Sequence, residues 1–197
     1  MKRLFDLLFS IFILILFLPF GLIISILILF SSPGGIFYRQ ERVGKNGKVF
    51  KLLKFRSMRI NADKSGKLTV GMRDNRITGI GYFIRKYKLD EFPQFINVLK
   101  GEMSIVGPRP EVPDYVALYD SNQREILKVK PGITDYASLE YFTENELLAK
   151  SDNPEKTYIE EIMPAKIKLN EKYLANPTLS SDLKIIWLTF KKIVGLK

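Results

Sequence analysis

Two adjacent carboxylates, Asp90 and Glu91, lie within a strongly basic part of the chain. The stretch YKLDEFPQFINVLKGEMSIVGPRP contains them, and Arg85 and Lys88 are close neighbours in sequence. An ionised carboxylate is a nucleophile that can attack phosphorus. Because the phosphate is also anionic, such an attack requires Mg²⁺ or Arg and Lys side chains to neutralise its oxygens. The structural alternative is that the two acids only stabilise the start of a helix, by about 0.3–1 kcal/mol.

The residues around this pair predict a helix that begins at about Leu89 or Asp90. Pro93 fits only in the first turn of a helix, and Gly101 is typical of the position just after its end. The free N–H groups of a first turn favour anions, so we expect Asp90 to stay ionised at pH 7. The apolar positions that repeat at helical spacing are Leu89, Phe92, Ile96 and Leu99.

Composition narrows the chemistry further. The chain has 197 residues, no cysteine and no histidine, and a formal net charge of +10. The absence of these two residue types excludes disulfides, thiolate chemistry, zinc hydrolysis and Ser-His triads. Catalysis would then rest on carboxylates, Lys, Arg, Tyr, Ser or a hard cation such as Mg²⁺. The excess of basic residues indicates an anionic partner, which on charge alone is a nucleic acid, an anionic lipid or a phosphorylated small molecule.

The first thirty residues form an apolar segment that is long enough to cross a bilayer. Pro19 and Gly21 interrupt its middle, and basic residues flank both of its ends. Basic flanks favour the cytoplasmic side, so a helix that is broken at Pro19 could enter and leave by the same face. We expect this re-entrant arrangement; a straight membrane span, a cleaved signal peptide and a buried core helix are the alternatives.

The rest of the chain predicts a helix-rich α+β domain. Two strand-like pieces flank a turn at Gly44–Gly47, and a basic stripe runs along them. The stripe indicates either contact with lipid headgroups or phosphate, or a basic hairpin that only prevents aggregation. The sequence SIVGPRPE predicts a short strand that runs into a rigid turn. Residues 164–176 and 179–197 form amphipathic segments, and the second could pack on the core or lie in a membrane interface. We therefore expect a membrane segment at 1–31 and a cytosolic catalytic domain at 32–197.

Three motifs in this order resemble one family. They are SPGGIFYRQERVGKNGKVFKLLKFRSM, KLDEFPQFINVLKGEMSIVGPRPE and KPGITDYAS, and they follow an apolar segment with a central proline. This arrangement is similar to the bacterial sugar transferase family, the monotopic polyprenol-phosphate phosphoglycosyl transferases, in their minimal catalytic form. The resemblance covers most of the chain.

The resemblance implies a two-step reaction. The aspartate that matches Asp90 attacks the β-phosphorus of a UDP-sugar, UMP leaves, and undecaprenyl phosphate then takes the sugar phosphate from the enzyme. Glu91 would position Asp90 or share Mg²⁺, the family's cofactor, with it. The resemblance places the protein on the cytoplasmic face of the bacterial inner membrane with both termini cytoplasmic. It implies membrane lipids and downstream glycosyltransferases of surface or glycoprotein glycan assembly as partners, and no nucleic acid. The residues expected near the phosphates and the nucleotide are Lys54, Arg56, Arg85, Arg109 and Asp135.

Three positions depart from the family's usual pattern. Leu18 precedes Pro19 where serine is frequent, Asp135 replaces a glycine, and Asn170 replaces an acid. The last two changes bear on the choice of sugar, for which an acetamido or amino sugar is our expectation by analogy. A membrane-tethered basic scaffold or binding module is the rival interpretation, but it leaves Asp90, Glu91 and the GPRP motif unexplained.

Overall fold

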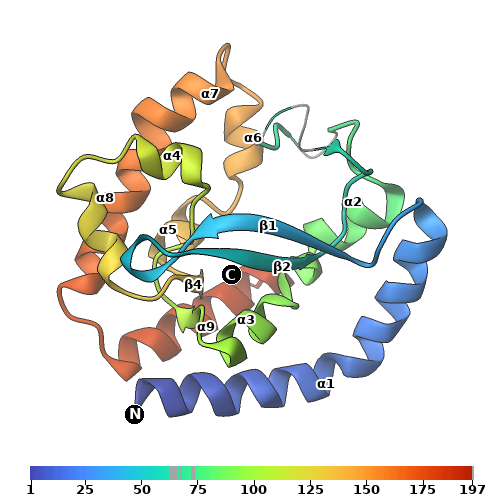
Figure 1. The fold of residues 1–197 in the computed structure, drawn as a ribbon, viewed down its shortest axis with the longest axis horizontal. Helices are drawn as coiled ribbons and strands as arrows, with labels where there is room; N and C mark the ends of the chain where they lie inside the picture. Colours follow the sequence, from blue (N-terminus) through green and yellow to red (C-terminus); the bar gives the residue numbers. More distant parts are fainter. Residues whose placement is uncertain (63–65, 67, 72–73, 197) are drawn as a thin grey trace.

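The computed structural model describes residues 1–62, 66, 68–71 and 74–196. The described chain is helix-rich, as predicted, and contains two small sheets, of which the sequence predicted only the hairpin (Figure 1). The helices are α1 (Lys2–Ser31), α2 (Gly79–Lys86), α3 (Gln94–Lys100), α4 (Pro113–Ala117), α5 (Tyr136–Glu140), α6 (Glu144–Leu148), α7 (Pro154–Thr157), α8 (Met163–Leu174) and α9 (Leu179–Val194). The 3₁₀ segments are η1 (Lys45–Gly47), η3 (Leu89–Glu91) and η4 (Gln123–Lys128), and η5 (Tyr158–Ile162) is a π-helical turn. The strands are β1 (Phe37–Val43), β2 (Val49–Phe55), β3 (Ser104–Val106) and β4 (Gly132–Thr134).

Strands β1 and β2 form the predicted antiparallel hairpin at the centre of the molecule (Figure 1). Its turn, η1, contains Asn46 and Gly47 with φ values of 58° and 75°. Asparagine and glycine tolerate this left-handed backbone better than other residues do, which explains the Asn-Gly pair at the turn. From the other side, the buried amide of Asn97 on α3 accepts a 2.9 Å hydrogen bond from Leu53 N–H and donates one to Lys51 C=O. The hairpin is thereby fixed to α3.

The second sheet pairs β3 and β4 in parallel, with Ser104 opposite Gly132. The backbones of Gly107 and Gly132 approach so closely that a Cβ on either residue would overlap the other's strand or its neighbours. Glycine at both positions therefore allows the GPRP motif to lie directly beside the start of the GITD segment. The sequence predicted β3 but not this pairing, which joins residues that are far apart in the chain.

Helix α1 is one continuous helix that contains Pro19, and its axis changes direction along its course (Figure 1). It is long and apolar enough to cross a membrane, and 11% of its most apolar window is buried. These properties are consistent with membrane association. Because no bilayer is present, the re-entrant arrangement stays a prediction.

The N-terminal half of α1 is attached to the body of the protein by polar contacts. Arg3 donates to the Val98 carbonyl at 2.7 Å, at the C-terminal end of α3. The buried Asp6 accepts a 2.8 Å hydrogen bond from the Ser104 hydroxyl. Lys2 forms a 2.5 Å ion pair with Asp182 on α9. These three contacts fix the N-terminal end of α1 to α3, β3 and α9.

Three clusters of buried side chains form the core. One lies among β1, α4, η5 and α8, one among β2, β3, α3 and α9, and one between the second half of α1 and α2.

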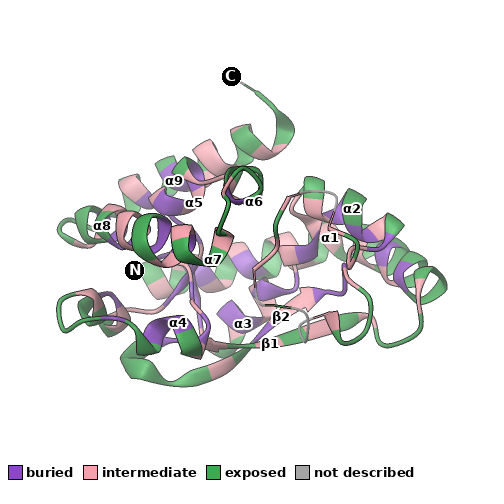
Figure 2. Cartoon of the chain, turned by 90° about the horizontal axis from the view of Figure 1, so that it is seen from above, coloured by how far each residue is buried: buried purple, intermediate pink, exposed green. Residues whose placement is uncertain are grey.

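The two amphipathic segments predicted at the C-terminus are α8 and α9. Figure 2 shows many exposed residues along α1, whereas Gln94, Asn97 and Val98 of α3 are buried. The expected position of α9 in a membrane interface stays a prediction.

Candidate active site

The two acids lie on a tight turn of their own. Lys88 adopts a left-handed conformation, with φ at 55°, and directs the chain into the 3₁₀ turn η3. We expected Asp90 and Glu91 in the first turn of the following helix, but α3 begins only at Gln94. Pro93 lacks the N–H that would continue the hydrogen bonding, which explains why the helix is interrupted here. The chain therefore projects the two acids from a sharp corner rather than from a regular helix.

Glu91 is held by two cations that come from distant parts of the sequence. Its carboxylate accepts hydrogen bonds from Arg109, at 2.5 Å and 3.0 Å, and from Lys54 at 3.3 Å. Burial alone would raise the pKa of Glu91, but Arg109 and Lys54 together hold it well below its usual range. Glu91 is therefore a fixed anion that orients two cations. Both of its oxygens are engaged in these contacts.

Asp90 is in the opposite electrostatic situation. It is 4% exposed, and its carboxylate forms no hydrogen bond with any of the described residues. Burial raises the pKa of Asp90 and the charge of Glu91 adds to this, against the opposing effect of Lys54, Arg85 and Lys88. The expectation from sequence considered only the helix start and the cations, so it missed the effect of burial. A desolvated carboxylate with no fixed partner is more reactive than a solvated one.

Lys54 extends from β2 to the two acids. Its burial, opposed mainly by Glu91, lowers its pKa to about 8. Its ammonium group is therefore easily deprotonated compared with that of a solvated lysine. A phosphate that entered the site would add negative charge and favour the protonated form.

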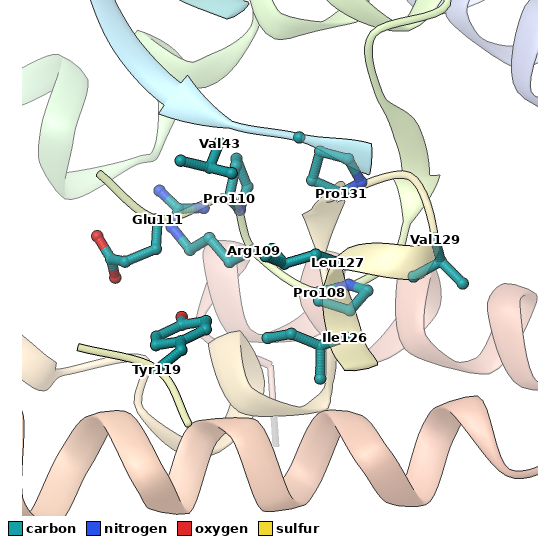
Figure 3. Close-up of a pocket in the computed structure, with 11 residues that line it drawn as sticks. Val43, Pro108, Arg109, Pro110, Glu111, Tyr119, Ile126, Leu127, Val129 and Pro131 are labelled. Atoms are coloured by element: carbon teal, nitrogen blue, oxygen red, sulfur yellow. The ribbon is translucent and has the colours of Figure 1, made fainter. Parts of the chain in front are cut away.

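The backbone of Arg109 is fixed independently of its side chain. Its N–H donates to Asp135 at 3.0 Å, and the other Asp135 oxygen accepts from Ser138 N–H at 2.6 Å as the N-cap of α5. Asp135 is fully buried, so it positions the arginine and has no exposed surface for a ligand. Figure 3 shows the other side of the turn, where Pro108 and Pro110 flank Arg109. A cavity of about 10 Å³ remains there, close to the volume that one water requires.

The remaining predicted site residues lie around the same cleft at different distances from the acids. Arg85 lines the cleft, with Ser57 as a hydrogen-bond partner at 3.5 Å. Arg56 also lines the cleft, but its guanidinium binds the carbonyls of Ser32, at 2.7 Å, and of Ile28 and Pro33. It thereby caps the C-terminal end of α1. Pro19 lies on α1, is exposed, and is not among the residues that line the cleft.

The cleft has a volume of about 930 Å³ and includes residues that sequence reasoning missed. Arg42 donates to the carbonyl of Pro110 at 2.9 Å and to Glu111 at 3.0 Å, and Tyr158 donates to the other oxygen of Glu111. Lys166 pairs with Glu144 at 2.8 Å on the same wall. No local motif signals these contacts, because each joins segments that are separated by tens of residues.

The side chains present fit Mg²⁺ only in part. Among the described residues there is no group of three or more Asp and Glu side chains that could hold a metal. Mg²⁺ is usually held by one or two carboxylates together with substrate phosphates and water. Asp90 fits this pattern, because its carboxylate is not committed to a hydrogen bond. Glu91 does not fit in this arrangement, because two cations already occupy its oxygens.

Comparison with known proteins agrees with this geometry. A family model described as bacterial sugar transferase matches residues 1–195. The chain belongs to the bacterial sugar transferase family. The resemblance that its motifs indicated is thereby confirmed, and the protein is an enzyme of the phosphotransferase class.

Three relatives illustrate the range of this family. A Bacillus subtilis (strain 168) protein is 49% identical over 133 residues, covering 68% of this chain and 70% of the relative. Its name, marked as provisional, is undecaprenyl-phosphate N-acetylgalactosaminyl 1-phosphate transferase. The UDP-glucose:undecaprenyl-phosphate glucose-1-phosphate transferase of Escherichia coli (strain K12) is 36% identical over 203 residues, covering 99% of this chain and 40% of the relative. The exopolysaccharide production protein ExoY of Sinorhizobium fredii is 35% identical over 207 residues, covering 98% and 84% respectively.

Proposed function

We propose that this sugar transferase moves a sugar 1-phosphate from a UDP-sugar to undecaprenyl phosphate and releases UMP. The observation that carries the proposal is Asp90, a buried carboxylate beside a second acid that is fixed by two cations. The names of the relatives support the acceptor, and they support a sugar-phosphate donor. Because these names include both glucose and N-acetylgalactosamine, the acetamido or amino sugar remains part of the proposal.

The chemistry proceeds through a covalent intermediate on Asp90. A carboxylate oxygen of Asp90 attacks the β-phosphorus, and the bond from this phosphorus to the bridging oxygen breaks, so that UMP leaves with the electron pair. A phosphate oxygen of the acceptor then attacks the same phosphorus, and the bond to Asp90 breaks. The products are polyprenyl diphosphosugar, UMP and the original carboxylate. The carboxylate of Asp90 and the phosphate of the acceptor carry no proton on the attacking oxygen when they are ionised, so neither step requires a base to remove one.

The cations of the site stabilise the charge that develops during transfer. Glu91, the neighbour of Asp90 in the chain, holds Arg109 and Lys54 at fixed positions, and Arg85 lines the same cleft. Preorganised cations of this kind lower the barrier without having to reorganise during the reaction. Mg²⁺ would be held by Asp90 and the donor's diphosphate, where it supplies further charge neutralisation.

We further propose that α1 enters and leaves the cytoplasmic face of the bacterial inner membrane. The proline within the helix, its change of direction and the basic residues at both ends support this arrangement. Both termini would then be cytoplasmic, and the active site would lie at the membrane surface, where a lipid acceptor and a soluble donor meet. The product would serve glycosyltransferases that assemble a surface polysaccharide or a glycoprotein glycan.

The test is release of UMP from a panel of UDP-sugars by detergent-solubilised protein with Mg²⁺, with and without undecaprenyl phosphate. We expect sustained release with one donor or a few, dependence on the lipid, and loss of release in Asp90→Asn. A rapid first turnover without the lipid would reveal the covalent intermediate, detectable as a mass increase of one sugar phosphate. If folded protein releases no UMP from any donor of the panel, the proposal is wrong and the rival binding-module interpretation is favoured.

A further inference from the structure

The large cleft has an apolar branch that the chemistry described above does not use. Its walls come from α1 and α9, and its floor comes from α3 and the β3–β4 sheet. The side chains that line this branch are Phe9, Ile13, Phe95, Ile133, Ile186 and Ile193.

These six side chains are all half-buried rather than fully buried. An apolar side chain that faces an open cleft lacks packing partners on one side and remains in contact with water. The nearby core residue Ile185 is 0% exposed, so the same helix packs tightly on its neighbouring face. The branch therefore has an apolar surface available to a ligand.

Helices α1 and α9 lie together at one end only. At their N-terminal ends, Lys2 and Asp182 form a 2.5 Å ion pair, and Tyr173 also donates to Asp182. Further along α9, Thr189 contacts Thr134 of β4 at 2.6 Å, so this helix stays on the sheet. Meanwhile α1 continues away along the edge of the molecule (Figures 1 and 2). The branch is thus closed at one end and lined by a membrane-type helix along its side.

A continuous row of aromatic rings leads from this branch to the acidic turn. The centroids of Phe9 and Phe95 are 6.4 Å apart, those of Phe95 and Phe92 are 6.0 Å apart, and Phe92 stacks on Phe17 at 3.7 Å. Phe92 follows Glu91 directly in the chain, so the row ends beside the catalytic corner. A ligand in the apolar branch would therefore have one end next to Asp90.

We propose that the apolar branch between α1 and α9 holds the first isoprene units of the polyprenyl phosphate acceptor. This inference rests on the proposed function for the identity of the acceptor, and it adds where the lipid chain lies. The phosphate of the lipid would lie at the cationic end, near Asp90 and Lys54, and its chain would follow Phe92 and Phe95 between the two helices. An unbranched alkyl phosphate would fill the branch less completely than a methyl-branched prenyl chain.

Photolabelling tests the position of the chain without requiring turnover. The full-length protein in detergent is irradiated with a polyprenyl phosphate that carries a diazirine in one of its first isoprene units, and the labelled peptides are identified by mass spectrometry. We expect labels on α3 and α9, with competition by unlabelled undecaprenyl phosphate. Labels confined to the outer face of α1, around Leu8 and Phe12, which are both 60% exposed, would overturn the proposal.

Kinetics of a matched pair of variants provides the second test. Ile193→Trp fills the branch near its end, whereas Val194→Trp adds the same bulk at the adjacent residue, which is 49% exposed and does not line the cleft. We expect Ile193→Trp to raise the KM for undecaprenyl phosphate at least tenfold, with the KM for the UDP-sugar unchanged and the control close to wild type. Equal KM values for the acceptor in both variants would overturn the proposal.

The two tests separate this inference from the proposed function. If the wild-type protein turns over no UDP-sugar, the proposed function fails, while the photolabelling result still decides whether the branch binds a prenyl phosphate. If turnover is normal, but α9 is not labelled and Ile193→Trp leaves the KM for undecaprenyl phosphate unchanged, the function stands and the proposed position of the lipid chain is wrong.

Discussion

The two adjacent acids are expected to have opposite effects on the stability of the protein. Asp90 is buried and has no hydrogen-bond partner among the described residues, and its pKa is raised, so its ionised form destabilises the folded state. Glu91 is paired with Arg109 and Lys54 and its pKa is lowered, so its ionised form stabilises the folded state. Asp90→Asn and Glu91→Gln remove the charge from each acid with almost no change of shape.

The expected magnitudes follow from burial. Removal of one member of a buried ion pair costs about 3–5 kcal/mol. Because the side chains of Glu91, Lys54 and Arg109 are 14–29% exposed, we expect Glu91→Gln to lower the free energy of unfolding by less, about 2–3 kcal/mol. For a domain of this size that lowers Tm by about 4–12 °C. Each unit by which burial raises the pKa of Asp90 lowers the free energy of unfolding at neutral pH by about 1.4 kcal/mol. Asp90→Asn should therefore raise Tm by about 3–5 °C for each such unit.

Thermal unfolding of the detergent-solubilised variants at pH 7, followed by intrinsic tryptophan fluorescence, measures both shifts. A pH series then separates the causes. The stability contributed by Glu91 is present above its ordinary pKa of 4.5 and is lost as the pH falls below it. The destabilisation by Asp90 is complete above its raised pKa and disappears as the pH falls to its ordinary 3.8. If Asp90→Asn lowers Tm as much as Glu91→Gln does, the assignment of these different roles is wrong.

Three further predictions concern the supports of the site. Gly34→Ala should lower the free energy of unfolding by about 2–3 kcal/mol, because Gly34 has φ at 117° and a Cβ there would overlap the Arg56 guanidinium. The control Gly35→Ala has open space around it and should leave Tm unchanged in the same thermal unfolding experiment. Asp135→Gly removes the acceptor of Arg109 N–H and the N-cap of α5. We expect it to raise the KM for the UDP-sugar about tenfold, which corresponds to about 1.4 kcal/mol. A KM within twofold of the wild-type value would contradict this role of Asp135. EDTA should abolish turnover and leave Tm within about 1 °C, since no described cluster of acids holds a metal without substrate; a lower Tm would indicate a resident ion.

Local patterns in the sequence predicted the elements but not how they meet. The Asn-Gly turn predicted the hairpin, helical spacing predicted α9, and the acidic pair and GPRP motif indicated the site. The sequence did not predict the 3₁₀ turn at Asp90, because the helical spacing of apolar residues does not distinguish such a turn from the start of α3. The burial of Asp90, and hence the direction of its pKa shift, depends on how the surrounding segments pack around it. Contacts such as that of Tyr158 with Glu111 depend on a fold that local spacing does not specify.

Strand β2 connects the apolar helix α1 with the two acids of the candidate active site. Lys54 and Arg56 are two positions apart on this strand and its continuation, so both side chains emerge on the same face. Lys54 contacts Glu91 in the site, and Arg56 binds carbonyls at the C-terminal end of α1. The end of the apolar helix is therefore fixed to the strand that supplies a cation to the active site. In the proposed reaction, Asp90 takes a phosphorus atom from a soluble donor and passes it to a lipid acceptor, and this connection holds the acids at a constant position relative to α1.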